Sequence, residues 1–181
     1  NDRESVGPES SSLFVRYHKK DKTWTFTNKS HSRIGNIQPS VVQLDANNLL
    51  AFCRRGGGYG PMRDGFIVKT ESHDGGRTWL PGVDTEFPNP NAAVDLIKLK
   101  NGHLVMIYND SDQGHRNPLV MRVSTDEGKT WPVSRVILDT PNDEQAYPYI
   151  IQTADSRING VFTSKRRTQV NHFSLDESDI K

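Results

Sequence analysis

The chain has 181 residues, of which 33% are hydrophobic, and its 23 basic side chains are almost balanced by 22 acidic ones. A net charge of +1 leaves no basic stripe, which argues against nucleic acid held through its phosphates as a partner. The longest apolar runs, 49–53 and 104–108, are far shorter than the roughly 20 residues of a membrane span, so no span is expected.

The first predicted strands lie in the N-terminal third. The chain begins at Asn1 with neither an initiator methionine nor an apolar leader, and we interpret it as a processed chain or a piece of a longer one. Residues 17–24 are a worn copy of a pattern that recurs twice further along. Two β-type runs, 41–44 and 49–52, then flank a polar turn and predict a hairpin. Cys53 ends the second run; as the only cysteine it forms no internal disulfide, and its apolar surroundings predict a buried, unreactive thiol.

The same hairpin pattern recurs with a period of roughly 50 residues. The later pairs are 96–99 with 104–107, and 150–153 with 158–161. Single strands are expected over 65–71 and 118–123, and outgoing strands after Trp79 and Trp131. Four short strands in each unit of this length are typical of a β-propeller blade, and no stretch shows helical periodicity.

Two turns share the pattern S-x-D-x-G-x-T-W, and each stands between an incoming and an outgoing strand. Its members are Ser72, Asp74, Gly76, Thr78 and Trp79 in the first copy, and Ser124, Asp126, Gly128, Thr130 and Trp131 in the second. Ser and Asp side chains accept backbone N–H groups in tight turns, Gly allows a positive φ, and Trp is a large apolar anchor. A calcium loop is the alternative, but it would need alternating oxygen ligands and a terminal Glu, which neither copy supplies. The turns are therefore predicted to stabilise the fold.

These units predict an all-β chain in the form of a β-propeller with about three blades present. We divide it into the end of a preceding blade at 1–34, blades at 35–89 and 90–140, and an incomplete last blade at 141–181. The internal alignment places Gln38, Ala93 and Tyr147 at equivalent points on the first strands, which line the central channel of a propeller.

The repeated turns resemble the Asp-boxes of the sialidase (neuraminidase) superfamily, in its branch with BNR repeats. The similarity runs from about residue 34 to 176 and is strongest over 88–109, 116–131 and 147–167. It implies a six-bladed propeller, of which this chain is roughly the second half.

The resemblance also implies a site. Members of the family bind a sugar carboxylate with three arginines and use a Tyr nucleophile assisted by a Glu, with an Asp as acid/base. Arg54 resembles the second arginine, Arg116 the third, and Tyr147 the nucleophile. Gln38 stands where the Glu is expected and cannot accept the phenol proton. Apart from the resemblance, Glu144 lies three residues before Tyr147; a solvent-exposed position is the favoured expectation for it, and it would replace the missing base if its loop folds inward. No segment resembles the region of the first arginine and the Asp, which lie in N-terminal blades.

Each of these residues also has a structural interpretation. Arg54 with its neighbour Arg55 is a common solvated strand end, Arg116 lies in a polar loop, and Tyr147 before a proline is a common packed aromatic. Repeat equivalence and the resemblance together favour the functional interpretation.

The expected function is that of an exo-sialidase-like glycoside hydrolase that acts on a terminal sialic acid or related acidic sugar with retention. Its partner would be an acidic glycan or sialoglycoconjugate. No cofactor is expected, and the six histidines show no metal-ligand spacing. A carbohydrate-binding propeller without hydrolysis, motivated by Gln38, and a hydrolase or lyase for another acidic glycan remain open. The sequence does not indicate a compartment.

Overall fold

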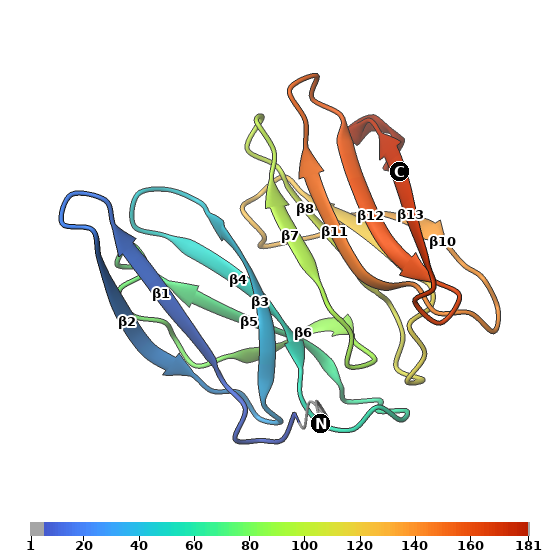
Figure 1. The fold of residues 1–181 in the computed structure, drawn as a ribbon, viewed down its shortest axis with the longest axis horizontal. Coiled ribbons are helices and arrows are strands. Elements are labelled where there is room, and N and C mark those ends of the chain that lie inside the picture. Colours follow the sequence, from blue (N-terminus) through green and yellow to red (C-terminus); the bar gives the residue numbers. More distant parts are fainter. Residues whose placement is uncertain (1–5, 181) are drawn as a thin grey trace.

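The computed structural model describes residues 6–180, and Figure 1 shows four antiparallel sheets that follow one another along the chain. Residues 1–5 of the predicted segment 1–34, and residue 181 of the predicted last blade, lie outside the described residues. The predicted all-β propeller fold is confirmed, because the middle two sheets each have four strands in the simple up-and-down order of a blade.

The strand bounds are as follows. The first sheet pairs β1 (Ser12–His18) with β2 (Thr23–Ser30). The second contains β3 (Asn36–Gln43), β4 (Leu49–Arg55), β5 (Phe66–Ser72) and β6 (Val83–Pro88). The third contains β7 (Asp95–Lys98), β8 (Leu104–Asn109), β9 (Leu119–Ser124) and β10 (Val133–Leu138), and the fourth contains β11 (Ala146–Gln152), β12 (Ile158–Ser164) and β13 (Gln169–Leu175). Within residues 6–180 the only helical element is the 3-10 turn at Glu177–Asp179.

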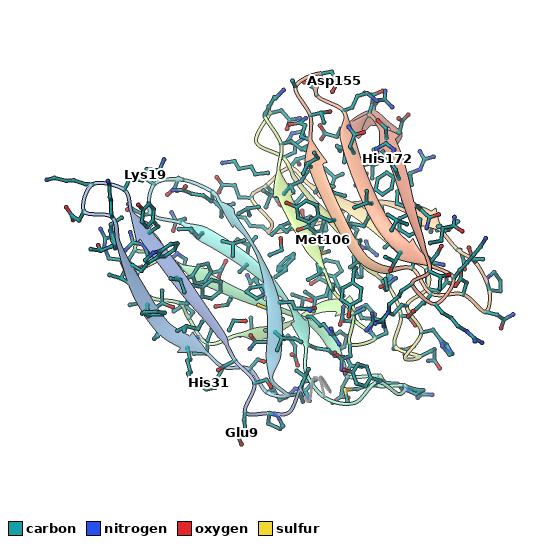
Figure 2. All side chains as sticks on the ribbon, in the orientation of Figure 1. Glu9, Lys19, His31, Met106, Asp155 and His172 are labelled. Atoms are coloured by element: carbon teal, nitrogen blue, oxygen red, sulfur yellow. The ribbon has the colours of Figure 1, made fainter. Side chains whose placement is uncertain are left out.

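The hydrophobic core lies between the faces of neighbouring sheets rather than in one central mass. Phe52 and Met106 belong to one cluster, between the second and third sheets, and Figure 2 shows Met106 in the interior. Met121 and Ile150 belong to a second cluster, between the third and fourth sheets. The predicted burial of Cys53 is confirmed, because its thiol is fully buried and burial raises its pKa to about 12.

The two Asp-box turns have the hydrogen bonds that their sequence predicts. In the first, Asp74 Oδ1 accepts the N–H groups of Arg77 and Thr78 at 2.8 and 2.9 Å, and Oδ2 accepts the Thr78 hydroxyl at 2.7 Å. In the second, Asp126 accepts the Thr130 N–H and hydroxyl at 2.9 and 2.7 Å. These bonds to the ionised form hold the pKa of Asp74 well below its usual range and lower that of Asp126 to about 2.

Each Asp-box tryptophan packs against the preceding sheet. Trp79 is 4% exposed and stacks on Phe14 of β1 with ring centroids 3.7 Å apart, and Trp131 is 6% exposed and lies 5.7 Å from the ring of Phe52. Trp24 of the worn copy is 61% exposed. The complete boxes therefore join successive sheets.

The first strands of the last three sheets lie side by side, with β7 between β3 and β11 (Figure 1). Asp95 of β7 holds both neighbours, because its carboxylate accepts the Ser40 hydroxyl at 2.7 Å and the Ile150 N–H at 2.8 Å. The residues that the internal repeat placed on a common axis therefore come from adjacent strands.

Candidate active site

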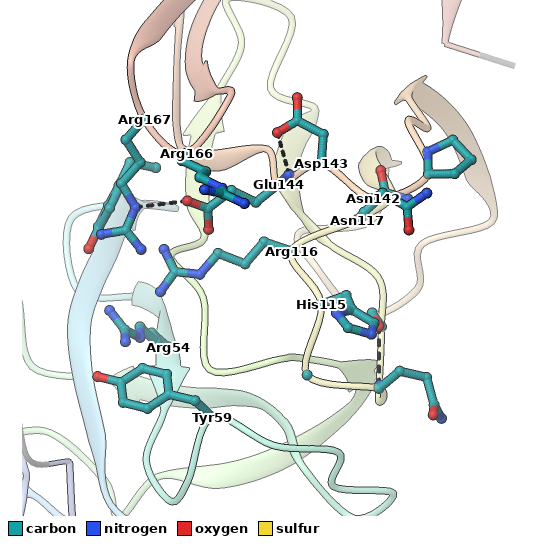
Figure 3. A pocket seen from close by; sticks show the side chains of 15 residues that line it. Arg54, Tyr59, His115, Arg116, Asn117, Asn142, Asp143, Glu144, Arg166 and Arg167 are labelled. Atoms are coloured by element: carbon teal, nitrogen blue, oxygen red, sulfur yellow. Dashed lines mark hydrogen bonds and ion pairs between the residues drawn. The ribbon is translucent and has the colours of Figure 1, made fainter.

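A cavity of about 1290 Å³ opens where three of the sheets meet, and Figure 3 shows its lining. Arg54 reaches it from the end of β4, Arg116 from the loop between β8 and β9, and Tyr147 from β11. The structure thus brings together three of the four residues singled out as catalytic or carboxylate-binding. The fourth, Gln38, lines a smaller cavity of about 570 Å³ next to the first strands.

The interpretation of Arg54 and Arg55 as a solvated strand end is wrong, because both side chains are fully buried. Arg55 is structural: its guanidinium donates to the carbonyls of Asn89 and of Gly56, the latter at 2.7 Å. Burial and the charge of Arg54 lower the pKa of Arg55. Alternating strand geometry sends these neighbours to opposite sides, and only Arg54 lines the cavity.

Arg116 is also buried, with 8% exposure, so a purely surface role in its loop is excluded. Its Nη2 lies 3.5 Å from the carbonyl of Asn91, and among residues 6–180 its buried Nη1 has no hydrogen-bond partner. Its own carbonyl accepts the Gln145 N–H at 2.7 Å, which fixes the loop two residues before Tyr147. A buried guanidinium nitrogen without an acceptor is costly, and a bound anion would supply one.

Asn91 contacts both arginines, a role that sequence reasoning did not assign to it. Its Oδ1 accepts Arg54 Nε at 2.6 Å, while its carbonyl faces Arg116 Nη2. Its Nδ2 donates to the Gly57 carbonyl at 2.9 Å, so both the oxygen and the nitrogen of the side-chain amide are hydrogen-bonded. The residue has a φ of 57°, in the left-handed region that Asn tolerates better than most residues.

Gln38 and Tyr147 share an unusual backbone. Each lies at a register shift in the first strand of its sheet and has a positive φ, 52° for Gln38 and 53° for Tyr147. Side chains other than Gly are strained in this region, and such strain is concentrated at functional sites. The repeat equivalence of the two positions therefore extends to their backbone conformation. Gln38 Oε1 accepts Arg54 Nη1 at 3.2 Å, so this residue contacts the cavity through the arginine.

The ring of Tyr147 lies between two guanidinium groups, with Arg116 5.2 Å and Arg167 5.0 Å from its centroid. Arg167 in turn donates to Glu144, Nε to Oε1, at 3.1 Å (Figure 3). The loop that carries Glu144 thus folds toward the cavity, and its carboxylate is engaged by a cation. Sequence reasoning had found Glu144 but not Arg166 or Arg167, which lie in a β-turn without a motif.

Among residues 6–180 no group of three or more His, Cys, Asp or Glu side chains is arranged to hold a metal ion. No helix in this part of the chain has the length and apolar character needed to cross a membrane.

Solved sialidases have the fold of this chain. The NanB sialidase of Streptococcus pneumoniae matches 98% of the chain with a TM-score of 0.76 and 18% identity, and the chain covers 28% of it. An ulvan lyase, a polysaccharide lyase solved with bound GlcA(1-4)Rha3S, matches 88% of the chain with a TM-score of 0.61 and 15% identity, and the chain covers 41% of it.

Comparison by sequence points to the same superfamily. A curated sialidase of Micromonospora viridifaciens is 26% identical over 112 residues, which are 57% of this chain and 16% of that protein. The chain therefore spans less than half of each of these proteins. The model of the family described as "BNR repeat-like domain" matches residues 6–159, most of the chain. With its two Asp-boxes and its sialidase-type sheets, the chain belongs to this BNR repeat-like family of the sialidase superfamily.

Proposed function

We propose that this chain supplies the carboxylate-binding and nucleophilic part of a sialidase-type site, which hydrolyses the bond to a terminal sialic acid or a related acidic sugar. The observation that carries the proposal is that Arg54, Arg116 and Tyr147, from three different sheets, line one cavity. Guanidinium groups are always charged and bind carboxylates through planar paired hydrogen bonds, which suits an anionic sugar.

In this proposal Arg116 is the principal carboxylate ligand, because its buried Nη1 has no acceptor among the described residues. Arg54 contributes the second guanidinium, which Asn91 and Gln38 hold in place. Once the carboxylate is bound, the anomeric carbon that carries it lies near the ring of Tyr147, which is already 5.2 Å from the Arg116 guanidinium.

The proposed chemistry has two steps with retention overall. The Tyr147 oxygen attacks the anomeric carbon, the glycosidic C–O bond breaks, and a carboxylic acid of the site protonates the departing oxygen. Water then attacks the same carbon and gives a proton back to that group, while the bond to Tyr147 breaks and the tyrosine oxygen recovers its proton from the assisting base. A phenol suits this role because a carboxylate nucleophile would be repelled by the anionic sugar.

The phenol proton needs an acceptor, and Gln38 cannot serve. Asp143 and Glu144 are the carboxylates that line the cavity, and Asp143 is occupied with the N–H groups of Glu144 and Lys165. We therefore assign Glu144 as the assisting base. Its ion pair with Arg167 holds it on the side of the Tyr147 ring.

The test is release of a fluorescent phenol from a sialoside by the full-length protein, with Tyr147→Phe as the matched control. We expect turnover that Tyr147→Phe abolishes while sialoside binding changes little, because only the nucleophilic oxygen is lost. Arg116→Gln should instead weaken binding by about tenfold or more, the usual value for a hydrogen bond to a charged group. If the unmodified protein turns the sialoside over no faster than Tyr147→Phe does, the proposed hydrolase function is refuted.

A second candidate function is carbohydrate binding without hydrolysis, and it is favoured by Gln38 at the position of the assisting Glu. Calorimetry separates the two functions. A sialoside that binds with sensitivity to Arg116→Gln and is recovered intact after prolonged incubation would select the binding protein. A uronic-acid glycan should be assayed in parallel, because two arginines specify a carboxylate and not the sugar ring that carries it.

A further inference from the structure

Two arginines of the cavity, Arg166 and Arg167, have no role in substrate binding in the site described so far. Both lie in the turn between β12 and β13 and, unlike the buried Arg54 and Arg116, both are solvent-exposed. They therefore lie at the solvent-exposed part of the same cavity lining, and Figure 3 shows both near Glu144. Exposed arginines are common on protein surfaces. An anion-binding role therefore depends on the conformation of the turn and on the partners of each guanidinium.

The turn has a strained backbone that is fixed from outside. Lys165, Arg166 and Arg167 have φ values of 50°, 55° and 65°, three consecutive left-handed residues without a glycine. L residues adopt this region at a cost in free energy and do so mainly where the surrounding structure forces them. The Asp143 carboxylate accepts the Lys165 N–H at 2.9 Å, and the Thr168 hydroxyl donates to the Lys165 carbonyl at 2.6 Å. The Thr168 hydrogen bond closes the turn, and the Asp143 contact holds it against the loop that leads to Tyr147.

The two side chains differ in their partners. Arg167 donates Nε to Glu144 at 3.1 Å and lies over the Tyr147 ring, which leaves its terminal amino groups available. Arg166 makes no hydrogen bond or ion pair that the described part of the chain reveals. One guanidinium is thus fixed and the other is a neighbouring cation without a counter-charge.

The lining of the cavity carries an excess of positive charge. Four arginines face only two carboxylates there, those of Asp143 and Glu144, and both carboxylates already accept hydrogen bonds from the protein. A single sugar carboxylate would use Arg54 and Arg116. The cavity would then still hold, on its exposed side, the Arg166 guanidinium without a counter-charge and the terminal amino groups of Arg167, which is paired with Glu144 only through Nε.

We infer that Arg166 and Arg167 form a second anion-binding subsite, which receives a sulfate or carboxylate on the sugar next to the terminal acidic residue. The inference rests on the proposed function for the position of the first carboxylate, and it defines the substrate class as a glycan with two neighbouring acidic groups. Planar guanidinium donors bind the oxygens of either group in the same way.

The experiment compares matched pairs of glycans on the full-length protein by calorimetry: a sialyl-galactoside and a uronic-acid disaccharide, each with and without sulfate on the neighbouring sugar. In the unmodified protein, the sulfated member of a pair should bind about threefold to fivefold more tightly for each exposed arginine engaged. Arg166→Gln should remove this advantage and change binding of the unsulfated member by less than about twofold. Arg167→Gln should also reduce the ratio of affinities within each pair, and only this ratio is compared for that variant because Arg167 also holds Glu144. Lys165→Gln is the matched control, because it removes the same charge from the same turn at a residue that does not line the cavity.

A second readout separates failure of the subsite from failure of the proposed function. The Nε–H signals of Arg166 and Arg167 are followed by NMR during titration with inorganic sulfate, which needs no sugar site. If no glycan binds but sulfate shifts these signals, and does so equally in Lys165→Gln, the subsite stands and the proposed function fails. If both members of a pair bind equally, or if Lys165→Gln matches Arg166→Gln, the subsite is refuted and the proposed function is untouched. Failure of sulfate to shift either signal in a protein that binds no glycan also refutes the subsite.

Discussion

Asn91 offers the sharpest test of how the site is positioned, because its side chain accepts a hydrogen bond from Arg54 and its main-chain carbonyl faces Arg116, the two arginines of the proposed carboxylate site. Replacement by Ala removes the Oδ1 acceptor of Arg54 Nε and the Nδ2 donor to Gly57. It also places a less tolerant side chain at a φ of 57°. Asn91→Gly removes the same two hydrogen bonds but accepts that φ, so the pair of variants separates the two effects.

The magnitudes follow from these contacts. Asn91 is fully buried, so the loss of its amide leaves the Gly57 carbonyl and an Arg54 donor short of a partner, at about 1–3 kcal/mol for each group. The left-handed backbone adds about 1 kcal/mol for Ala and nothing for Gly. We therefore expect Asn91→Ala to lower the free energy of unfolding by about 3–7 kcal/mol, and Asn91→Gly by about 1 kcal/mol less.

Urea unfolding followed by tryptophan fluorescence gives the stability, and calorimetry with an acidic sugar gives the affinity. At a temperature where both variants remain folded, each should bind more weakly by about tenfold, because Arg54 is no longer held. The reasoning is refuted if both variants unfold at the native urea midpoint. It is also refuted if they bind the sugar with native affinity.

Further predictions concern the fold, its pH dependence and the residue at position 38. Trp131→Ala should lower the free energy of unfolding by about 3–5 kcal/mol because the ring is buried, while Trp24→Ala, at an exposed position, should change it by less than about 1 kcal/mol; equal effects would contradict the anchor role. The pKa of Asp126 is lowered to about 2 from an ordinary value of about 3.9, so its contribution is complete above about pH 4 and is lost as the pH falls through 2. The stability difference between the native chain and Asp126→Asn should therefore shrink over that interval in urea titrations, and a constant difference would count against it. Gln38→Glu restores the residue that the family uses, keeps the acceptor for Arg54, and should raise turnover of a sialoside by about a hundredfold; an unchanged rate would remove this position from the proton transfer.

The strands and blades could be predicted because their signals are local. Paired β-type runs around polar turns define each hairpin, and Asp74 and Asp126 satisfy their own turns within a few residues. The meeting of Arg116 and Tyr147 in one cavity could also be anticipated, because repeat position fixes which strand ends face the axis. A periodic sequence thus carries part of the tertiary structure.

The features that remained hidden depend on contacts between distant segments. Arg54 and Arg55 are adjacent residues of the same type, and Arg55 is structural because its guanidinium donates to the Gly56 carbonyl and to the carbonyl of Asn89, which is 34 residues away. The left-handed turn at 165–167 contains no glycine from which it could be predicted, and its contact with Asp143 stabilises it. The spacing of residues in a single sequence predicts neither the contact of Arg55 with Asn89 nor that of Lys165 with Asp143.

The most direct test of the central claim is to trap the sugar on the enzyme. A fluorinated sialosyl fluoride, in which the ring fluorine slows hydrolysis of the intermediate, should add one glycosyl group to the full-length protein. We predict that peptide mass spectrometry locates this group on Tyr147, that Tyr147→Phe abolishes the label, and that Arg116→Gln slows its appearance. Absence of a label, or a label on the more exposed Tyr149 instead, would contradict the assignment of Tyr147, Arg54 and Arg116 to one catalytic site.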